Sequence, residues 1–161
     1  MTYMKFLAMV ATATVVMFGL MYLNSYAIDH VFFSQTRAWM ALLMGAVMGL
    51  LMIGFMWNMY KGTGRKFGIV VAALVVFAGS LWLVRSQQTV DDVSYMKAMI
   101  PHHSIAILTS KRAHIRDPRV RELADGIIKA QVSEIEQMKA LISDLESHPV
   151  AVQAPDLRPT Q

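Results

Sequence analysis

The stretch "FGIVVAALVVFAGSLWLV", Phe67 to Val84, decides the class of fold. It carries no charged residue, and a helix needs about 17–25 predominantly apolar residues to cross a bilayer. Two further charge-free segments lie upstream, at Phe6–Ile28 and Ala38–Tyr60. The first is longer than the roughly 7–15 residues of a signal-peptide core, so we expect it to be retained. The sequence therefore predicts three transmembrane helices in a membrane domain over residues 1–84.

The loop between the second and third segments orients these spans. Residues 61–66, "KGTGRK", hold three basic side chains, and short basic loops remain in the cytoplasm. The N-terminus then also lies inside, whereas the loop Asp29–Arg37 and everything after Arg85 lie outside. Residues 85–161 hold ten basic and ten acidic residues. This balance leaves no basic patch for nucleic acid.

Methionine recurs at every fourth position of the second segment, at Met40, Met44, Met48, Met52 and Met56. A row with this spacing winds around a helix of 3.6 residues per turn. It is either a thioether path for a soft metal ion or filler between spans, and filler is the favoured interpretation. Gly45 and Gly49 in the same segment form a GxxxG pair, which permits close approach of another helix.

An antiparallel two-helix hairpin is expected outside the membrane. Asp91 is a suitable N-cap for a first helix that runs to about Ile115. Asp117 and Pro118 then supply a cap and a first helical residue for a second helix that ends near Ser147. The hairpin domain is expected over residues 85–148. A flexible C-terminal tail over residues 149–161 completes the chain.

The second helix has a heptad-like apolar stripe with two polar members. The stripe comprises Val120, Ala124, Ile127, Gln131, Glu134, Met138, Leu141 and Leu145. A buried carboxylate is normally paired or bound to a metal. We therefore expect a partner for Glu134 on the first helix.

The first helix carries "MIPHHSIAI", residues 99–107, at the matching level. His103 lies on its inward stripe and His102 on the flank of that stripe. Counting from the turn places His103 level with about residue 130 and Met99 with about residue 134. Met138 falls near the height of Met96. Pro101 should free a carbonyl group and bend the helix.

These residues form a candidate ligand set for a metal: Met96, Met99, His102, His103, Gln131, Glu134 and Met138. Imidazole and thioether together suit copper, as Cu(I) or Cu(II), and silver. Zinc is an alternative through His and Glu. A di-iron centre would need Glu-x-x-His, which does not occur here. The rival interpretation is a buried His–Glu pair that fixes helix register, with methionine as filler. His30, His114 and His148 are expected to be solvated or capping residues.

"MIPHHSIAI" followed by "ELADGIIKAQVSEIEQM" closely resembles the bacterial domain-of-unknown-function 305 family, over about Asp91–Leu145, and the upstream segments resemble its three-span membrane subgroup. The resemblance implies a ferritin-like helical fold and copper- or silver-binding relatives. One hairpin is half of a four-helix bundle, so a homo-oligomer, a dimer or higher, is expected.

Together these features predict an all-α membrane protein of the bacterial inner membrane with a periplasmic C-terminal domain. We expect a non-enzymatic binder of copper that serves buffering, tolerance or hand-off to a copper-handling partner. The alternative is a structural membrane oligomer in which the His/Glu layer only sets register. The lipid bilayer is the expected surrounding of the spans, and no nucleic acid is expected as a partner.

Overall fold

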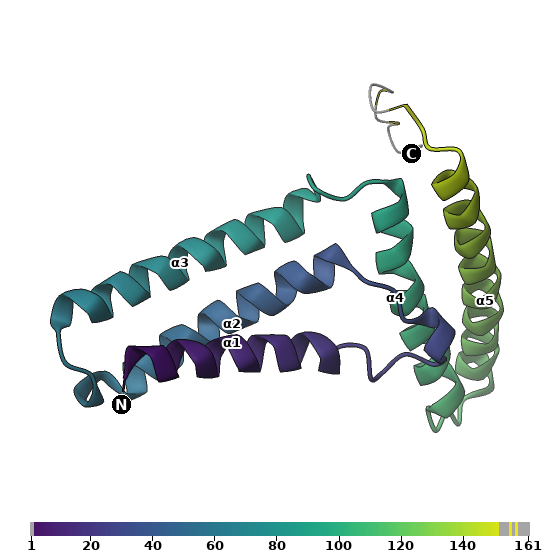
Figure 1. The fold of residues 1–161 in the computed structure, drawn as a ribbon. Helices are drawn as coiled ribbons and strands as arrows, with labels where there is room; N and C mark the ends of the chain where they lie inside the picture. The colour runs from purple at the N-terminus through teal and green to yellow at the C-terminus, as the bar shows by residue number, and fades with distance from the viewer. Residues whose placement is uncertain (1, 152–154, 156, 158–161) are drawn as a thin grey trace.

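The computed structural model describes residues 2–151, 155 and 157, so the predicted C-terminal tail lies mostly outside the described residues. The chain is all-α, as predicted. Three helices are long and apolar enough to cross a membrane, and two more form an antiparallel hairpin (Figure 1). The elements, in chain order, are α1 (Tyr3–Leu20), the 3₁₀ turn η1 (Ile28–His30), α2 (Gln35–Phe55), the 3₁₀ turn η2 (Trp57–Met59), α3 (Thr63–Ser86), α4 (Asp92–Arg112) and α5 (Pro118–Ser147).

The ends of the apolar helices differ from the charge-free segments. The first helix stops at Leu20 rather than near Ile28, and Asn24 and Ser25, residues of low helix propensity, lie in the segment that follows. The second helix begins earlier than expected, where the Ser34 hydroxyl accepts from the Arg37 N–H at 3.2 Å. Arg37, expected in the outer loop, therefore lies in the first turn of α2 and is buried.

Helix α2 packs against both α1 and α3 and is the most buried of the three apolar helices. The expected GxxxG pair is used inside the chain, because Gly45 faces Thr14 of α1. A Cβ on Gly45 would overlap the Thr14 hydroxyl and lie 3.2 Å from the Thr14 Cβ, whereas one on Gly49 would meet Val10 at ordinary contact distance. These glycines bring α1 and α2 together.

The helix caps of the hairpin are those predicted. The Asp91 carboxylate accepts from the Ser94 N–H at 2.7 Å, and the Asp117 carboxylate accepts from the Arg119 N–H at 2.9 Å. Pro118 occupies the first helical position of α5. Helix α4 ends at Arg112, three residues before the expected end, and continues through the fully buried Pro101.

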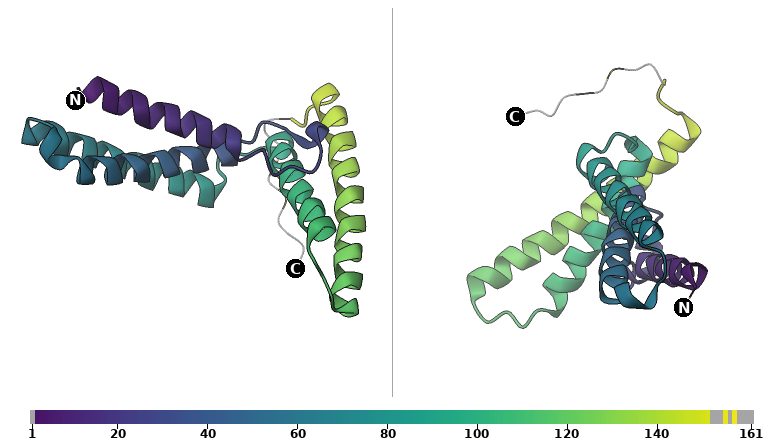
Figure 2. Two further views of the ribbon diagram at one scale, coloured as in Figure 1. Left: turned by 90° about the horizontal axis from the view of Figure 1, so that it is seen from below. Right: turned by 90° about the vertical axis from the view of Figure 1, so that its left-hand side faces the viewer.

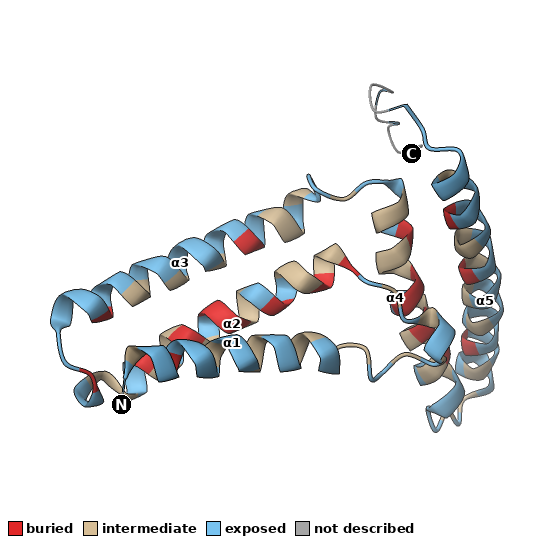
Figure 3. Ribbon diagram, in the orientation of Figure 1, coloured by how far each residue is buried: buried red, intermediate tan, exposed pale blue. Residues whose placement is uncertain are grey.

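The hairpin lies across one end of the three apolar helices, and the N-terminus lies at their other end (Figures 1 and 2). Helix α4 contacts both α2 and the η1 turn, and α5 packs on α4. Figure 3 shows the buried positions of the hairpin where α4 and α5 face one another. The buried hairpin core comprises Met96, Ile100, Ile107, Ile135 and Ile142.

The core stripe of α5 is displaced from the predicted one. Ile135 and Ile142 are buried, whereas Val120 and Leu141 are about half exposed. The apolar face of α5 is wider than one heptad stripe, and α4 packs against the edge of that face that carries Ile135 and Ile142. Glu134, expected inside the core, consequently lies at the border, with 46% of its side chain exposed.

Candidate metal centre

The two adjacent histidines of α4 face different surroundings. Successive residues on an α-helix are about 100° apart around its axis. His103 points at α5 and contacts Glu134, whereas His102 lines a hollow on the side of α4 that faces the apolar helices. Their ring centres are 6.3 Å apart. The predicted ligand set is therefore divided by α4 itself.

His103 and Glu134 form the contact that links the two helices at this level. His103 Nδ1 lies 3.0 Å from Glu134 Oε2. Nδ1 is buried and makes no hydrogen bond of good geometry with any of the described residues. The expectation that something on the first helix meets Glu134 is confirmed, although the carboxylate is less buried than predicted.

Burial sets the protonation of His103. Desolvation lowers the pKa of its imidazole below the usual 6.5, and the neighbouring Glu134 carboxylate opposes that shift only in part. The neutral imidazole, which is the form that binds metal, is thus the favoured form at neutral pH. The Gln131 side-chain amide donates to Glu134 Oε2 at 3.1 Å and holds that carboxylate in place.

The methionines fall into two groups. Met96 is buried in the hairpin core and Met138 packs against the same core, as their predicted common height requires. Met99 lies with His102 in the hollow on the other side of α4. Within the described residues, no three His, Asp or Glu side chains gather as a metal-binding cluster.

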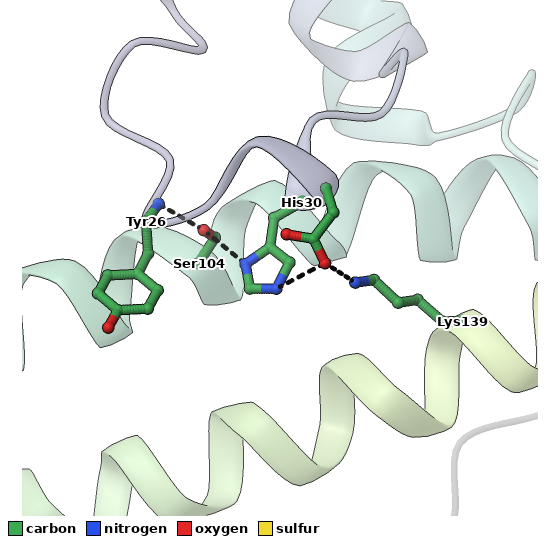
Figure 4. Close-up of polar contacts among 5 residues, drawn as sticks. Tyr26, His30, Ser104 and Lys139 are labelled. Atoms are coloured by element: carbon green, nitrogen blue, oxygen red, sulfur yellow. Dashed lines mark hydrogen bonds and ion pairs between the residues drawn. The ribbon is translucent and has the colours of Figure 1, made fainter.

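A polar junction that the sequence did not reveal fixes α4 beside the outer loop (Figure 4). Ser104 Oγ accepts from the Tyr26 N–H at 2.7 Å and lies 3.0 Å from His30 Nδ1. Lys139 of α5 donates to Asp29 at 2.6 Å. His30, expected to be solvated, is therefore largely covered, with 13% of its side chain exposed.

The junction contains Ser, His and Asp but is not arranged as a nucleophilic triad. Ser104 is fully buried, so no substrate reaches its hydroxyl. His30 Nε2 and Asp29 Oδ2 are 3.9 Å apart, too far for a hydrogen bond. The effect of the junction is to hold the α4 backbone next to His103 in place. His30 and Ser104 are 74 residues apart, so no local pattern in a single sequence indicates their contact.

The geometry defines a helical protein with candidate membrane spans and a hairpin that carries a His-His motif. The family model described as "Domain of unknown function (DUF305)" matches residues 86–157. A relative, "Uncharacterized protein L153" of Acanthamoeba polyphaga mimivirus, is 33% identical over 106 residues, which cover 60% of this chain and 68% of the relative. The chain belongs to the DUF305 family, as the motif predicted. No solved structure matches it.

Proposed function

We propose that the protein is a membrane-anchored, non-enzymatic metal-binding protein whose hairpin lies on the periplasmic side of a bacterial inner membrane. Its metal is copper, with silver or zinc as alternatives, and its role is buffering, tolerance or hand-off. One observation carries the proposal: the buried His103 Nδ1 faces Glu134 at 3.0 Å without an aligned hydrogen-bond partner.

The separation of these two atoms fits shared coordination. Two donor atoms bound at about 2.1 Å to one ion, with roughly 90–110° between the bonds, lie about 3.0–3.4 Å apart. The neutral state of His103 supports the same role, because a metal ion does not have to displace a proton from it. The Gln131 amide donates to the same Oε2 atom that faces His103 and orients the carboxylate, as hydrogen-bond partners of metal ligands do.

A His–Glu pair alone holds a transition metal weakly, so further ligands are needed. Met96 and Met138 pack in the adjoining core and can supply thioethers for Cu(I). A second copy of the hairpin is the other source, because α5 exposes Val120, Leu123 and Leu141 on its surface. Pairing through this surface would complete a helical bundle and make the protein a homo-oligomer.

The orientation rests on charge. Lys61 and Arg65 lie in or near the loop between α2 and α3, at the opposite end of the apolar helices from the hairpin. Basic residues in short loops favour the cytoplasmic side. The hairpin then lies outside, where the protein would meet copper before it enters the cytoplasm.

The same contact favours a second candidate function, in which His103 and Glu134 only set the register of α4 against α5. This reading requires no metal. It explains the pair, but it leaves the His103 Nδ1 without a hydrogen bond of good geometry.

Metal analysis separates the two functions. The full-length protein in mild detergent is exposed to equal copper, silver and zinc, desalted, and assayed for retained metal. We expect copper to be retained, and His103→Ala to remove most of the Cu(II). His148→Ala is the matched control, because His148 lies 3.3 Å from Asp144 at an exposed end of α5. Retention of no metal by the wild-type protein would support the register function.

Glu134→Gln sharpens the distinction, because it keeps the shape of the side chain and removes its charge. A metal centre should then lose Cu(II) or Zn(II) affinity more than Cu(I) affinity, since a hard carboxylate matters less to the softer ion. A register pair should instead show a change in thermal stability with metal binding absent before and after the substitution.

A further inference from the structure

A hollow of about 400 Å³ lies between α4 and the outer ends of the first two apolar helices. We call it the outer hollow and define it by four of its lining residues: Met21 and Met40 from the apolar helices, and Met99 and His102 from α4. Met21 follows the end of α1 and Met40 lies in the second turn of α2. Segments far apart in sequence thus bring three thioethers and one imidazole to one place.

The donor set of the outer hollow differs from that of the His103–Glu134 pair. Thioether and imidazole ligands without carboxylate select soft ions such as Cu(I) and Ag(I). Among the described residues that line the hollow, none is Asp or Glu. No carboxylate in the hollow would therefore offset the charge of a divalent ion, whereas a soft monovalent ion carries less charge to be offset.

Arg37 also lines the outer hollow, and its charge bears on selectivity. Its guanidinium donates to the Met21 carbonyl and lies over the Tyr22 ring, 4.5 Å from the ring centre. Arginine is thus occupied by partners other than the thioethers. Its repulsion of a bound cation scales with the charge of that cation, so it disfavours Cu(II) or Zn(II) about twice as much as Cu(I) or Ag(I).

We propose that Met21, Met40, Met99 and His102 form a second metal site, selective for a soft monovalent ion, between the membrane helices and the hairpin. The inference rests on the proposed metal-binding role but on none of the residues of the His103–Glu134 pair. His102 is exposed on α4, outside the apolar helices, so an ion can reach the hollow from that side. The unbranched methionine side chains can move inward to close a hollow larger than an ion.

The two faces of α4 would then carry different chemistry. His103 with Glu134 suits Cu(II) or Zn(II), and the neighbouring Met96 and Met138 extend that centre to Cu(I), whereas His102 with three thioethers suits only the softer ions. The remaining methionines of the α2 row do not share this arrangement. Met44, Met48, Met52 and Met56 line a separate groove whose described lining residues include no histidine.

Silver titration of the full-length protein in detergent tests the site. Ag(I) is the probe, and isothermal calorimetry gives its affinity. Met21→Leu with Met40→Leu removes two thioethers at nearly constant volume. Residues that support metal ligands typically contribute roughly 10–100-fold to metal affinity. Removal of two direct ligands should cost at least as much, so we expect the Ag(I) affinity to fall at least about tenfold. Met4→Leu with Met59→Leu, both exposed and at the opposite end of the apolar helices, should leave it unchanged.

A second readout does not depend on variants that fold. X-ray absorption of the Ag(I)-loaded wild-type protein should show sulfur neighbours in the first coordination shell, and a shell of nitrogen and oxygen only would overturn the proposal. Unchanged Ag(I) affinity in the Met21/Met40 variant would also overturn it.

Measuring Cu(II) in parallel separates the two sites. Loss of Ag(I) with intact Cu(II) binding in the Met21/Met40 variant supports the outer hollow. If His103→Ala loses Cu(II) binding and the Met21/Met40 variant binds Ag(I) as the wild type does, the proposed function stands and the second site is rejected. An Ag(I) effect in the Met21/Met40 variant without a Cu(II) effect in His103→Ala supports the inference and rejects the first centre.

Discussion

Gly45→Ala should destabilise the packing of the apolar helices α1 and α2. The added methyl group would overlap the Thr14 hydroxyl of α1 and lie 3.2 Å and 3.3 Å from the other two atoms of that side chain. The hydroxyl is held by its own hydrogen bond to the Val10 carbonyl at 2.9 Å. It cannot turn away without losing that bond, so α1 has to move.

The expected cost follows from two opposing effects. Overpacking a tight contact costs typically about 1–3 kcal/mol. Replacing glycine by alanine inside a helix returns roughly 0.5–1 kcal/mol. The middle of these ranges gives a net loss of about 1 kcal/mol, with bounds of about 0 and 2.5 kcal/mol. A loss of about 1 kcal/mol corresponds to roughly 2–4 °C in the unfolding midpoint of a chain of this size.

Thermal unfolding in detergent, followed by circular dichroism, measures this loss. Gly79→Ala is the matched control, because a Cβ at Gly79 meets no atom within 4 Å. It should be neutral or slightly stabilising. Thr14→Ala removes the overlapping hydroxyl and the methyl group and leaves only the Cβ at 3.2 Å, so it should restore much of the stability in the double variant. A Gly45→Ala protein as stable as the control would refute the packing of α1 on this glycine, and would free the GxxxG pair for contacts between copies.

Four further outcomes are expected. Burial lowers the pKa of both His30 and His103 in the folded protein. The unfolded chain therefore binds more protons, and the free energy of unfolding should fall from its value above about pH 6.5 as the pH drops through the lowered folded-state pKa. Thermal melts of His30→Asn and His103→Gln should show a weaker fall with pH. Ser104→Ala should lower the free energy of unfolding, measured by chemical denaturation, by about 1–3 kcal/mol, because it leaves the buried partners of that hydroxyl without a hydrogen bond. Lys139→Ala, which breaks a partly exposed ion pair, should lower it by less than about 1 kcal/mol. Equal losses would contradict the central role given to Ser104 in the junction. A reporter fused after Gln161 should be active only in the periplasm, and a cytoplasmic signal would overturn the orientation. Cross-linking in mild detergent should give at least a dimer, and a strictly monomeric mass would count against the proposed bundle.

Local signals predicted the helices well. The absence of charge over Phe67–Val84 marks an apolar helix without reference to any partner, and capping by Asp91 or Asp117 depends only on residues within one turn. The hairpin and its approximate register followed from the short turn between the caps. The count from the turn placed His103 level with about residue 130, whereas His103 contacts Glu134, about one helical turn further along α5.

Features that depend on which neighbour covers a face were not accessible. Helical spacing places His102 and His103 about 100° apart, but it does not say that the membrane helices lie on one side of α4 and α5 on the other. The apolar face of α5 offered two nearly equivalent stripes, and contact with α4 selects the one that contains Ile135. The partners of Ser104 come from a loop between the first two apolar helices, whose path no local pattern describes.

The outer loop contributes more to the hairpin than a connection between two helices. Phe32 packs against the hydrophobic core of α4 and α5, and Tyr26 and His30 occupy the hydroxyl of Ser104. One folding unit is therefore assembled from two stretches of chain that the two apolar helices α2 and α3 separate. A soluble fragment cut at residue 85 would leave part of that core uncovered and would lack two thioethers of the outer hollow. Metal affinities measured on such an excised piece would therefore not test the centres proposed for the full-length chain.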